Sequence, residues 1–194
     1  MKKVYVNARL EDLDLERAFS QLSEQRRQYL LRFRQERSRR AGAAAYLLLR
    51  QGLHELFGID EAPEFAFGEH GKPYLTGHPD IYFSLSHCRE AAACIVATEP
   101  VGIDVESLRS FSPALLERTM NEAETATILA ASEPRRAFIR LWTQKEAYLK
   151  LTGTGLVDEL PTVLATAAAA GYVFQTTECC EKPFIMSVCS SSGD

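Results

Sequence analysis

The sequence lacks a long apolar run near its start, where MKKVYVNARL is followed at once by the acidic pair Glu11 and Asp12. A signal peptide or a membrane span needs a longer uninterrupted apolar segment. The five cysteines contain no CxxC pair, their number is odd, and the neighbours Cys179 and Cys180 are poorly placed to bond each other. These absences argue against a disulfide framework and predict a soluble protein of the reducing cytoplasm.

The sequence also lacks internal repeats and low-complexity linkers. Its 194 residues, 46% of them hydrophobic, are enough to bury a core without covalent cross-links. We therefore expect one compact unit, either a single domain or two small packed halves. The formal net charge of −4 is unevenly spread, since residues 1–97 carry 14 basic and 13 acidic side chains and residues 98–194 carry 8 and 13. The acidic surplus thus lies in the second half.

Apolar patterning predicts strands in both halves of the chain. VYVNARL has the pattern of an edge strand. EFAF, IYFSLS, AAACIVAT and VGIDVE have the patterns of further strands separated by turn residues, and together they predict one sheet. YVFQTT and FIMSVCS predict a closing hairpin.

Helical periodicity begins at Ser23, breaks near Gln35 and resumes until Gly58, a residue typical of helix ends. Three further helix starts are marked by Ser112 before Pro113, Asn121 with Glu124, and Ser132 before Pro134. The last of these helices is expected to run to about Leu151. The alanine-rich segment 165–171 is ambiguous.

The segment VGIDVE carries two carboxylates on one predicted strand face. Side chains alternate along a strand, so Asp104 and Glu106 lie opposite the face of the neighbouring valines and isoleucine. Two carboxylates on one face either repel each other or are neutralised by a cation, and hard oxygen ligands suit magnesium. A solvated strand face is the alternative interpretation of this hexapeptide.

The segment FIRLWTQKEAYLK is predicted to be helical. Trp142, Glu146 and Lys150 follow one another at intervals of four and would form one stripe on that helix. A surface ion pair beside a core tryptophan would explain the stripe equally well. Magnesium seldom works from two carboxylates alone, however, and Glu146 offers a third ligand or a base.

The first half contains an arginine-rich segment that would attract anions. Between residues 26 and 40 it carries seven arginines against a single acidic residue, Glu36. A solvated helical face and a nucleic-acid patch are the alternatives. Few aromatic residues are interleaved, Tyr29 and Phe33 among them, and the sequence pI is near 5.7, which disfavours nucleic acid.

Lys72, Ser86 and His87 are candidates for phosphate binding. Lys72 lies in the turn GKP, where glycine permits close approach of a ligand and proline stiffens the chain. Ser86 and His87 end the predicted strand IYFSLSH, and neighbours on a strand point to opposite faces. The sequence also has no GxSxG elbow, so phosphate binding is favoured over a pairing of nucleophile and base.

The order of these motifs resembles the 4′-phosphopantetheinyl transferase superfamily, in its long two-repeat form of surfactin and siderophore pathways. The matching blocks are GKP at 71–73, FSLSH at 83–87, VGIDVE at 101–106 and LWTQKEAYLKLTGTGL at 141–156. The resemblance implies an α+β fold of two similar α/β halves related by a pseudo-twofold. We expect the halves at 1–98, basic and on the nucleotide side, and at 99–194, with the metal and the catalytic helix.

The resemblance also implies roles for individual residues. Asp104, Glu106 and Glu146 match the magnesium ligands. Contacts to coenzyme A are implied for Arg26, Arg40, Lys72, Ser86, His87, Lys145 and Lys150. The catalytic residues implied are Glu146, Lys150 and, as an alternative base, His87. Two departures fall near the nucleotide, with Ala41 and Gly42 where a contacting hydroxyl can occur, and Thr154 stands where many relatives carry lysine.

The reaction implied is transfer of 4′-phosphopantetheine from coenzyme A to a serine of an apo acyl or peptidyl carrier protein, with release of adenosine 3′,5′-bisphosphate. A long chain that supplies both halves of the cleft is expected to be a monomer, and no nucleic-acid or membrane partner is expected. A catalytically inactive carrier-binding protein and an RNA-binding module are the alternatives that remain open.

Overall fold

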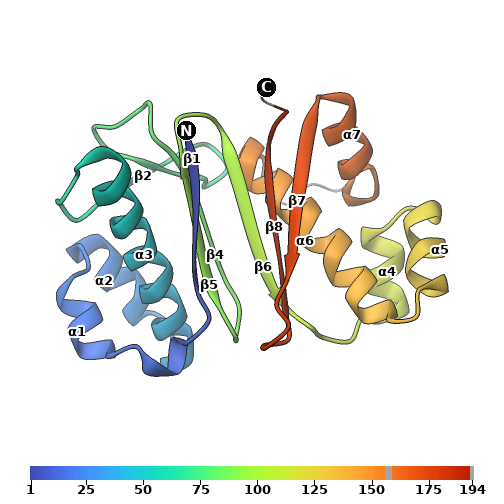
Figure 1. Ribbon diagram of the computed structural model, residues 1–194, viewed down its shortest axis with the longest axis horizontal. Helices are drawn as coiled ribbons and strands as arrows, with labels where there is room; N and C mark the ends of the chain where they lie inside the picture. The colour runs from blue at the N-terminus through green and yellow to red at the C-terminus, as the bar shows by residue number, and fades with distance from the viewer. Residues whose placement is uncertain (156–158, 193–194) are drawn as a thin grey trace.

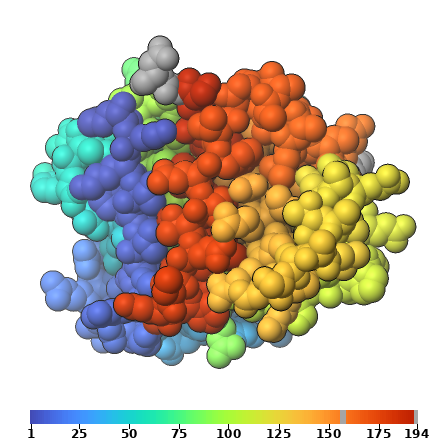
Figure 2. Space-filling model, turned by 45° about the vertical axis from the view of Figure 1, so that its right-hand side comes forward, coloured from blue at the N-terminus to red at the C-terminus, as the bar shows by residue number. Residues whose placement is uncertain are grey.

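The computed structural model describes residues 1–155 and 159–192, which form two three-stranded sheets packed face to face between two groups of helices (Figure 1). The layers follow the order helices, sheet, sheet, helices, and the chain completes the first pair of layers before it builds the second. The N-terminal strand nevertheless lies against the C-terminal hairpin (Figure 2). There Lys2 Nζ donates to Ser190 Oγ at 2.9 Å.

The first sheet has the antiparallel order β1-β5-β4 and is covered by three helices. A separate two-stranded hairpin, β2-β3, precedes its last two strands. The elements of this half are β1 (Lys2–Asn7), η1 (Leu10–Asp12), α1 (Leu15–Ser20), α2 (Glu24–Leu31), α3 (Glu36–Phe57), β2 (Phe65–Phe67), β3 (Pro73–Leu75), β4 (Tyr82–His87) and β5 (Ala92–Ala97).

The second sheet repeats this connectivity in the order β6-β8-β7. In both halves a first strand is followed by helices and then by an antiparallel hairpin whose second strand takes the centre of the sheet. This agrees with two similar halves; the boundary between 98 and 99 and the pseudo-twofold stay predictions. The elements of this half are β6 (Val101–Ser107), α4 (Pro113–Thr119), α5 (Glu122–Ala130), α6 (Pro134–Thr152), η2 (Leu160–Thr162), α7 (Val163–Ala169), β7 (Tyr172–Glu178) and β8 (Phe184–Ser191).

The caps expected from the sequence are mostly confirmed. Ser112 caps α4, Gly58 ends α3 with a left-handed φ of 66°, and the capping box of Asn121 and Glu124 begins α5. The N-cap of α6 is Glu133, one residue beyond the predicted Ser132. The ambiguous alanine-rich segment is mainly the helix α7.

The prediction of one sheet is wrong. EFAF contributes to the small β2-β3 hairpin, and VGIDVE, as β6, pairs with the C-terminal strand β8 instead of β4 or β5. The reason lies in the core, where β5 is buried on both faces. Its residues Cys94 and Val96 pack in the cluster that includes α3, whereas Ile95 packs with β6 and β8. Burial on both faces explains the unbroken apolar run of AAACIVAT.

Gly102, on β6, allows the backbone of α6 to pass unusually close to the sheet. A Cβ atom at this position would lie 1.9 Å from the carbonyl oxygen of Ala147 and 2.7 Å from the nitrogen of Leu151. We therefore predict that Gly102→Ala lowers the free energy of unfolding by about 1–3 kcal/mol, because α6 has to move outward. Urea denaturation measures this change.

Gly68→Ala is the matched control, since the nearest atom to its added methyl would be the Lys72 carbonyl oxygen at 3.7 Å. Its free energy of unfolding should change by no more than about 0.5 kcal/mol. An unchanged unfolding midpoint for Gly102→Ala would contradict the close approach of α6 to β6.

Candidate active site

The acidic face of β6 lies against the predicted stripe of α6. Trp142 Nε1 donates a hydrogen bond to Glu106 Oε1 at 3.3 Å, and Lys150 Nζ lies 2.6 Å from Asp104 Oδ1. Glu146 lies on the same stripe of α6, one helical turn from Trp142 and one from Lys150. Strand alternation and helical periodicity thus bring three carboxylates into one region between β6 and α6.

These carboxylates influence one another through their charge. Burial raises the pKa of Glu146 to about 7, and the negative charges of Asp104 and Glu106 add to the rise, which Lys150 opposes. Burial, and then the charge of Asp104, also raises the pKa of Glu106. Asp104 is buried, and its Oδ2 atom has no hydrogen-bond partner within residues 1–155 and 159–192. The three carboxylates therefore carry more negative charge than the neighbouring cationic side chains neutralise.

The three carboxylates fit a divalent cation by their chemistry. They offer hard oxygen donors, one buried oxygen that no described residue hydrogen-bonds, and mutual repulsion that a cation would relieve. Within residues 1–155 and 159–192, however, no three histidine, cysteine, aspartate or glutamate side chains are already grouped as a ligand set. The magnesium set of Asp104, Glu106 and Glu146 accordingly stays a prediction.

Two serines of β4 join the first half to β6. Ser84 Oγ accepts a hydrogen bond from the backbone N–H of Ile103 at 3.1 Å, and Ser86 Oγ accepts one from Val105 at 3.2 Å. The Ser86 hydroxyl also donates to Asp104 Oδ1 at 2.8 Å. Between β4 and β6, serine hydroxyl oxygens therefore accept the backbone hydrogen bonds that carbonyl oxygens accept within a sheet. The hydrogen bond from Ser86 also holds the Asp104 carboxylate in position.

Ser86 and His87 do not form a nucleophile and its base. The Ser86 side chain is buried and bonded to Asp104, whereas His87 is exposed. His87 lies at the mouth of a cavity, where partial burial of its ring, and then the positive charges of Arg26 and Lys150, lower its pKa. The opposite orientations of these two neighbours agree with strand alternation.

Two cavities meet at Lys150. The larger, of about 810 Å³, is lined by basic and aromatic side chains, among them Arg26, Tyr29, Arg32, Phe67 and His87. The smaller, of about 250 Å³, is mostly apolar and includes Phe83, Leu85, Leu149 and, at its acidic end, Glu146. One cavity thus suits an anion that carries a planar ring, and the other suits a thin apolar chain.

Arg26 is held firmly in the larger cavity. Its guanidinium donates to the Gly42 carbonyl at 3.1 Å and lies 5.0 Å from the centre of the Tyr29 ring. Burial lowers the pKa of Arg26, yet a guanidinium group keeps its charge at neutral pH. The cavity therefore contains a fixed positive charge beside an aromatic surface.

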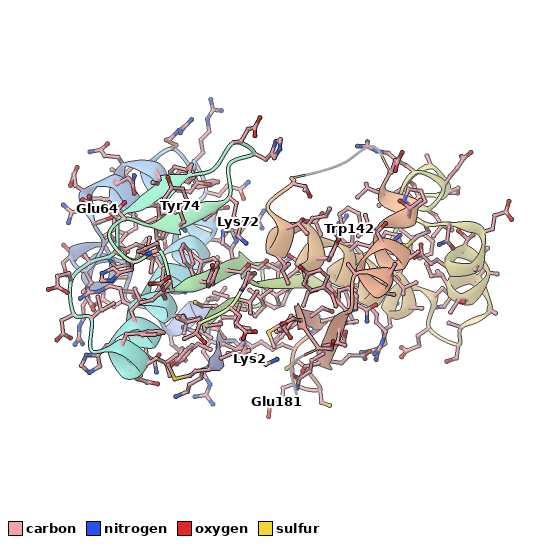
Figure 3. The ribbon with its side chains drawn as sticks, turned by 90° about the horizontal axis from the view of Figure 1, so that it is seen from above. Lys2, Glu64, Lys72, Tyr74, Trp142 and Glu181 are labelled. Carbon is pink, nitrogen blue, oxygen red and sulfur yellow. The ribbon has the colours of Figure 1, made fainter. Side chains whose placement is uncertain are left out.

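Lys72 reaches across from the first half to the end of α6. Figure 3 shows its side chain on the side of the β2-β3 hairpin that faces α6. Its Nζ donates to the carbonyl of Leu151 at 2.6 Å, and burial lowers its pKa. The ammonium group lies in the smaller cavity and satisfies a carbonyl at the helix C-terminus.

Lys145 and Arg40 are not among the residues that line the two cavities, and the contacts with coenzyme A predicted for them stay predictions. The Lys145 side chain is 0% exposed, and its Nζ binds Glu124 Oε2 at 2.7 Å and the Leu160 carbonyl at 2.8 Å. Arg40 pairs with Glu36 at 2.6 Å and donates to the Leu13 carbonyl. Intramolecular partners satisfy both cations.

Sequence reasoning missed three residues that contribute to the site. Ser84 lies two positions before Ser86, so the alternation of the strand places it on the same face. Tyr29 follows Arg26 by one helical turn, and that spacing predicts a shared face. Phe67, an exposed residue at the end of β2, carries no such signal.

Comparisons with known proteins agree with the motif order. Residues 100–186 match the family model of the 4′-phosphopantetheinyl transferase superfamily. A 4′-phosphopantetheinyl transferase of Bacillus subtilis is 28% identical over 156 residues, which cover 79% of this chain and 70% of the relative. The transferase psf-1 of Bacillus pumilus is 32% identical over 64% of this chain and 55% of its own length. The transferase HetI of Nostoc sp. is 35% identical over 61% and 54%.

Proposed function

We infer that this chain acts as a member of the 4′-phosphopantetheinyl transferase superfamily and transfers the phosphopantetheine group of coenzyme A to a serine of an acyl or peptidyl carrier protein. The observation that carries this function is the meeting of three environments at Lys150. A basic aromatic cavity, a mostly apolar cavity and a partly buried acidic cluster all reach Lys150. Coenzyme A has three corresponding parts: a nucleotide for the basic aromatic cavity, a pantetheine arm for the apolar cavity, and between them a pyrophosphate that would lie near Lys150.

The cavities suggest how coenzyme A would lie. The larger cavity would take the adenosine and its 3′-phosphate, with Arg26 and His87 near the anion and Tyr29 beside the base. The smaller cavity would take the pantetheine arm along Phe83 and Leu149, with Lys72 at its rim. The pyrophosphate would then lie between them, beside Lys150.

The carrier serine hydroxyl would attack the β-phosphorus of coenzyme A, and adenosine 3′,5′-bisphosphate would leave. Positioning and charge stabilisation dominate such phosphoryl transfers. Lys150 would stabilise the charge on the leaving phosphate, and Glu146 would accept the serine proton. Asp104, Glu106 and Glu146 would hold Mg²⁺, which supplies Lewis-acid stabilisation of the pyrophosphate. His87 is the alternative base.

The RNA-binding alternative is weakened by the partners of the arginines. Arg26, Arg27 and Arg40 each donate to a backbone carbonyl of the protein itself. Such arginines are less available to a phosphate backbone than the count of seven suggested. The alternative of an inactive carrier-binding protein is opposed by the retained carboxylates Asp104 and Glu146.

We propose that the protein acts as a monomer, because both cavities are lined by residues from the two halves of one chain, Leu85 and Lys150 among them. In the described part of the chain, no helix is long and apolar enough to cross a bilayer. The cytoplasmic location stays a prediction from the cysteine pattern.

We expect the protein to add one phosphopantetheine mass to at least one apo-carrier in the presence of coenzyme A and Mg²⁺. Intact-mass spectrometry of a panel of acyl and peptidyl apo-carriers measures this transfer, with reactions lacking coenzyme A as the control. Excess EDTA should abolish transfer, since the acidic cluster would lose its neutralising cation. Full transfer in EDTA would contradict the metal site, and the absence of any modified carrier would contradict the function.

A further inference from the structure

We propose that Lys150 is the internal counter-ion of Asp104 and must leave it before a divalent cation can bind tightly. Lys150 would thereby couple the binding of the metal to the binding of the coenzyme A phosphates. This inference rests on the proposed function and adds to it a reason for cooperative binding of the two ligands.

The contacts of Lys150 place its charge on the acidic cluster. Its Nζ lies 2.6 Å from Asp104 Oδ1 and 2.9 Å from Ser86 Oγ. The side chain of Asp104 is 5% exposed and that of Lys150 is 31% exposed, so the pair is shielded from water on the aspartate side. Glu106 has its own weaker partner, Arg109, at 3.8 Å. Asp104 is thus neutralised chiefly by Lys150.

This ion pair opposes metal binding. A cation that used Asp104 as a ligand would lie within a few ångströms of the ammonium group, and like charges at that separation in a partly buried site repel strongly. Asp104 Oδ2, which is buried and has no hydrogen-bond partner among the described residues, remains available as an oxygen ligand. The protein therefore has a suitable donor set whose affinity the lysine reduces.

Coenzyme A would remove that repulsion. Lys150 lines both cavities, so the pyrophosphate that joins the two ligand ends would pass beside its ammonium group. Lys150 would then leave Asp104 and form an ion pair with a phosphate of coenzyme A. The Asp104 carboxylate would thereby become available to the metal. By linkage, any factor by which coenzyme A raises the affinity for metal equals the factor by which metal raises the affinity for coenzyme A.

Binding of Mn²⁺ to the metal-free full-length chain, measured by electron paramagnetic resonance without coenzyme A, tests the inference. Lys150→Met removes the charge and should bind Mn²⁺ at least about tenfold more tightly than the wild type. Lys150→Arg retains the charge and should stay weak. Lys2→Met is the matched control, because that lysine donates to Ser190 Oγ at 2.9 Å, away from both cavities, and its Mn²⁺ affinity should equal that of the wild type.

Equal or weaker Mn²⁺ binding by Lys150→Met would overturn the inference. A gain that persists in the double variant Asp104→Asn/Lys150→Met would also overturn it, since the metal would then bind elsewhere. If Lys150→Met does not fold, as judged by circular dichroism, Lys150→Gln takes its place. Transfer by the wild type is measured separately, so active transfer without the Mn²⁺ gain would refute only this inference, and the gain without transfer would refute only the proposed function.

Discussion

Replacing Glu146 by glutamine should lower kcat at least about 100-fold while the KM for coenzyme A changes less. Glu146 lies between Trp142 and Lys150 on α6, and burial beside Asp104 raises its pKa to about 7. Glutamine keeps the size and helix propensity but neither accepts a proton nor binds a cation as a carboxylate does. A group whose contribution arises as protons and charge move affects mainly kcat. Steady-state assays over coenzyme A measure both constants.

Lys72→Ala should show the opposite kinetic pattern. Lys72 lies at the rim of the cavity proposed for the pantetheine arm, which does not change during the reaction, so the loss of Lys72 removes an interaction shared by ground and transition states. A charge-assisted hydrogen bond of about 1.5–3 kcal/mol corresponds to roughly a 10- to 100-fold rise in KM. If Glu146→Gln kept a near-normal kcat while His87→Ala abolished turnover, the proton would go to His87 instead of Glu146.

Lys145→Met should lower the free energy of unfolding by about 3–5 kcal/mol, the cost typical of breaking a buried ion pair. The Lys145 side chain is fully buried, and Glu124, its partner at 2.7 Å, is only 11% exposed. Without the ammonium group, Glu124 and the Leu160 carbonyl each lose a hydrogen bond. The contacts between α6, α5 and η2 would weaken. Chemical denaturation at constant pH measures the loss.

The double variant Glu124→Gln/Lys145→Met separates this ion pair from simple loss of packing. It removes both charges and should recover part of the stability lost in Lys145→Met, which a double-mutant cycle quantifies. Below the unfolding transition, Lys145→Met should keep the wild-type KM for coenzyme A, since Lys145 is not among the residues that line the two cavities. A raised KM with unchanged stability would instead support the coenzyme contact expected for this lysine from the sequence.

The elements that follow local rules could be predicted from the sequence alone. Period-two alternation placed Asp104 and Glu106 on one face, and intervals of four placed Glu146 and Lys150 on one helical stripe. Such features depend on backbone geometry within a single element, which neighbours along the chain determine. The caps at Ser112 and Gly58 were predictable for the same reason.

Tertiary packing decided which elements meet. The pairing of β6 with β8 joins residues that are 77 positions apart at Ser107 and Phe184 and 89 apart at Val101 and Ser190, and no local pattern distinguishes that partner from β5. Sequence patterning therefore predicted one sheet where two exist.

Packing also gave Lys145 and Lys150, the two lysines of α6, different surroundings. Lys145 and Lys150 are five residues apart on α6, so they project from different sides of the helix. Periodicity gives that difference, but it does not say which side faces Glu124 and which faces Asp104. The sequence alone thus determined the faces of the strand and the helix. The arrangement of α5, η2 and β6 around α6 determined which lysine stabilises the fold and which lies in the site, because only neighbouring elements decide what each face contacts.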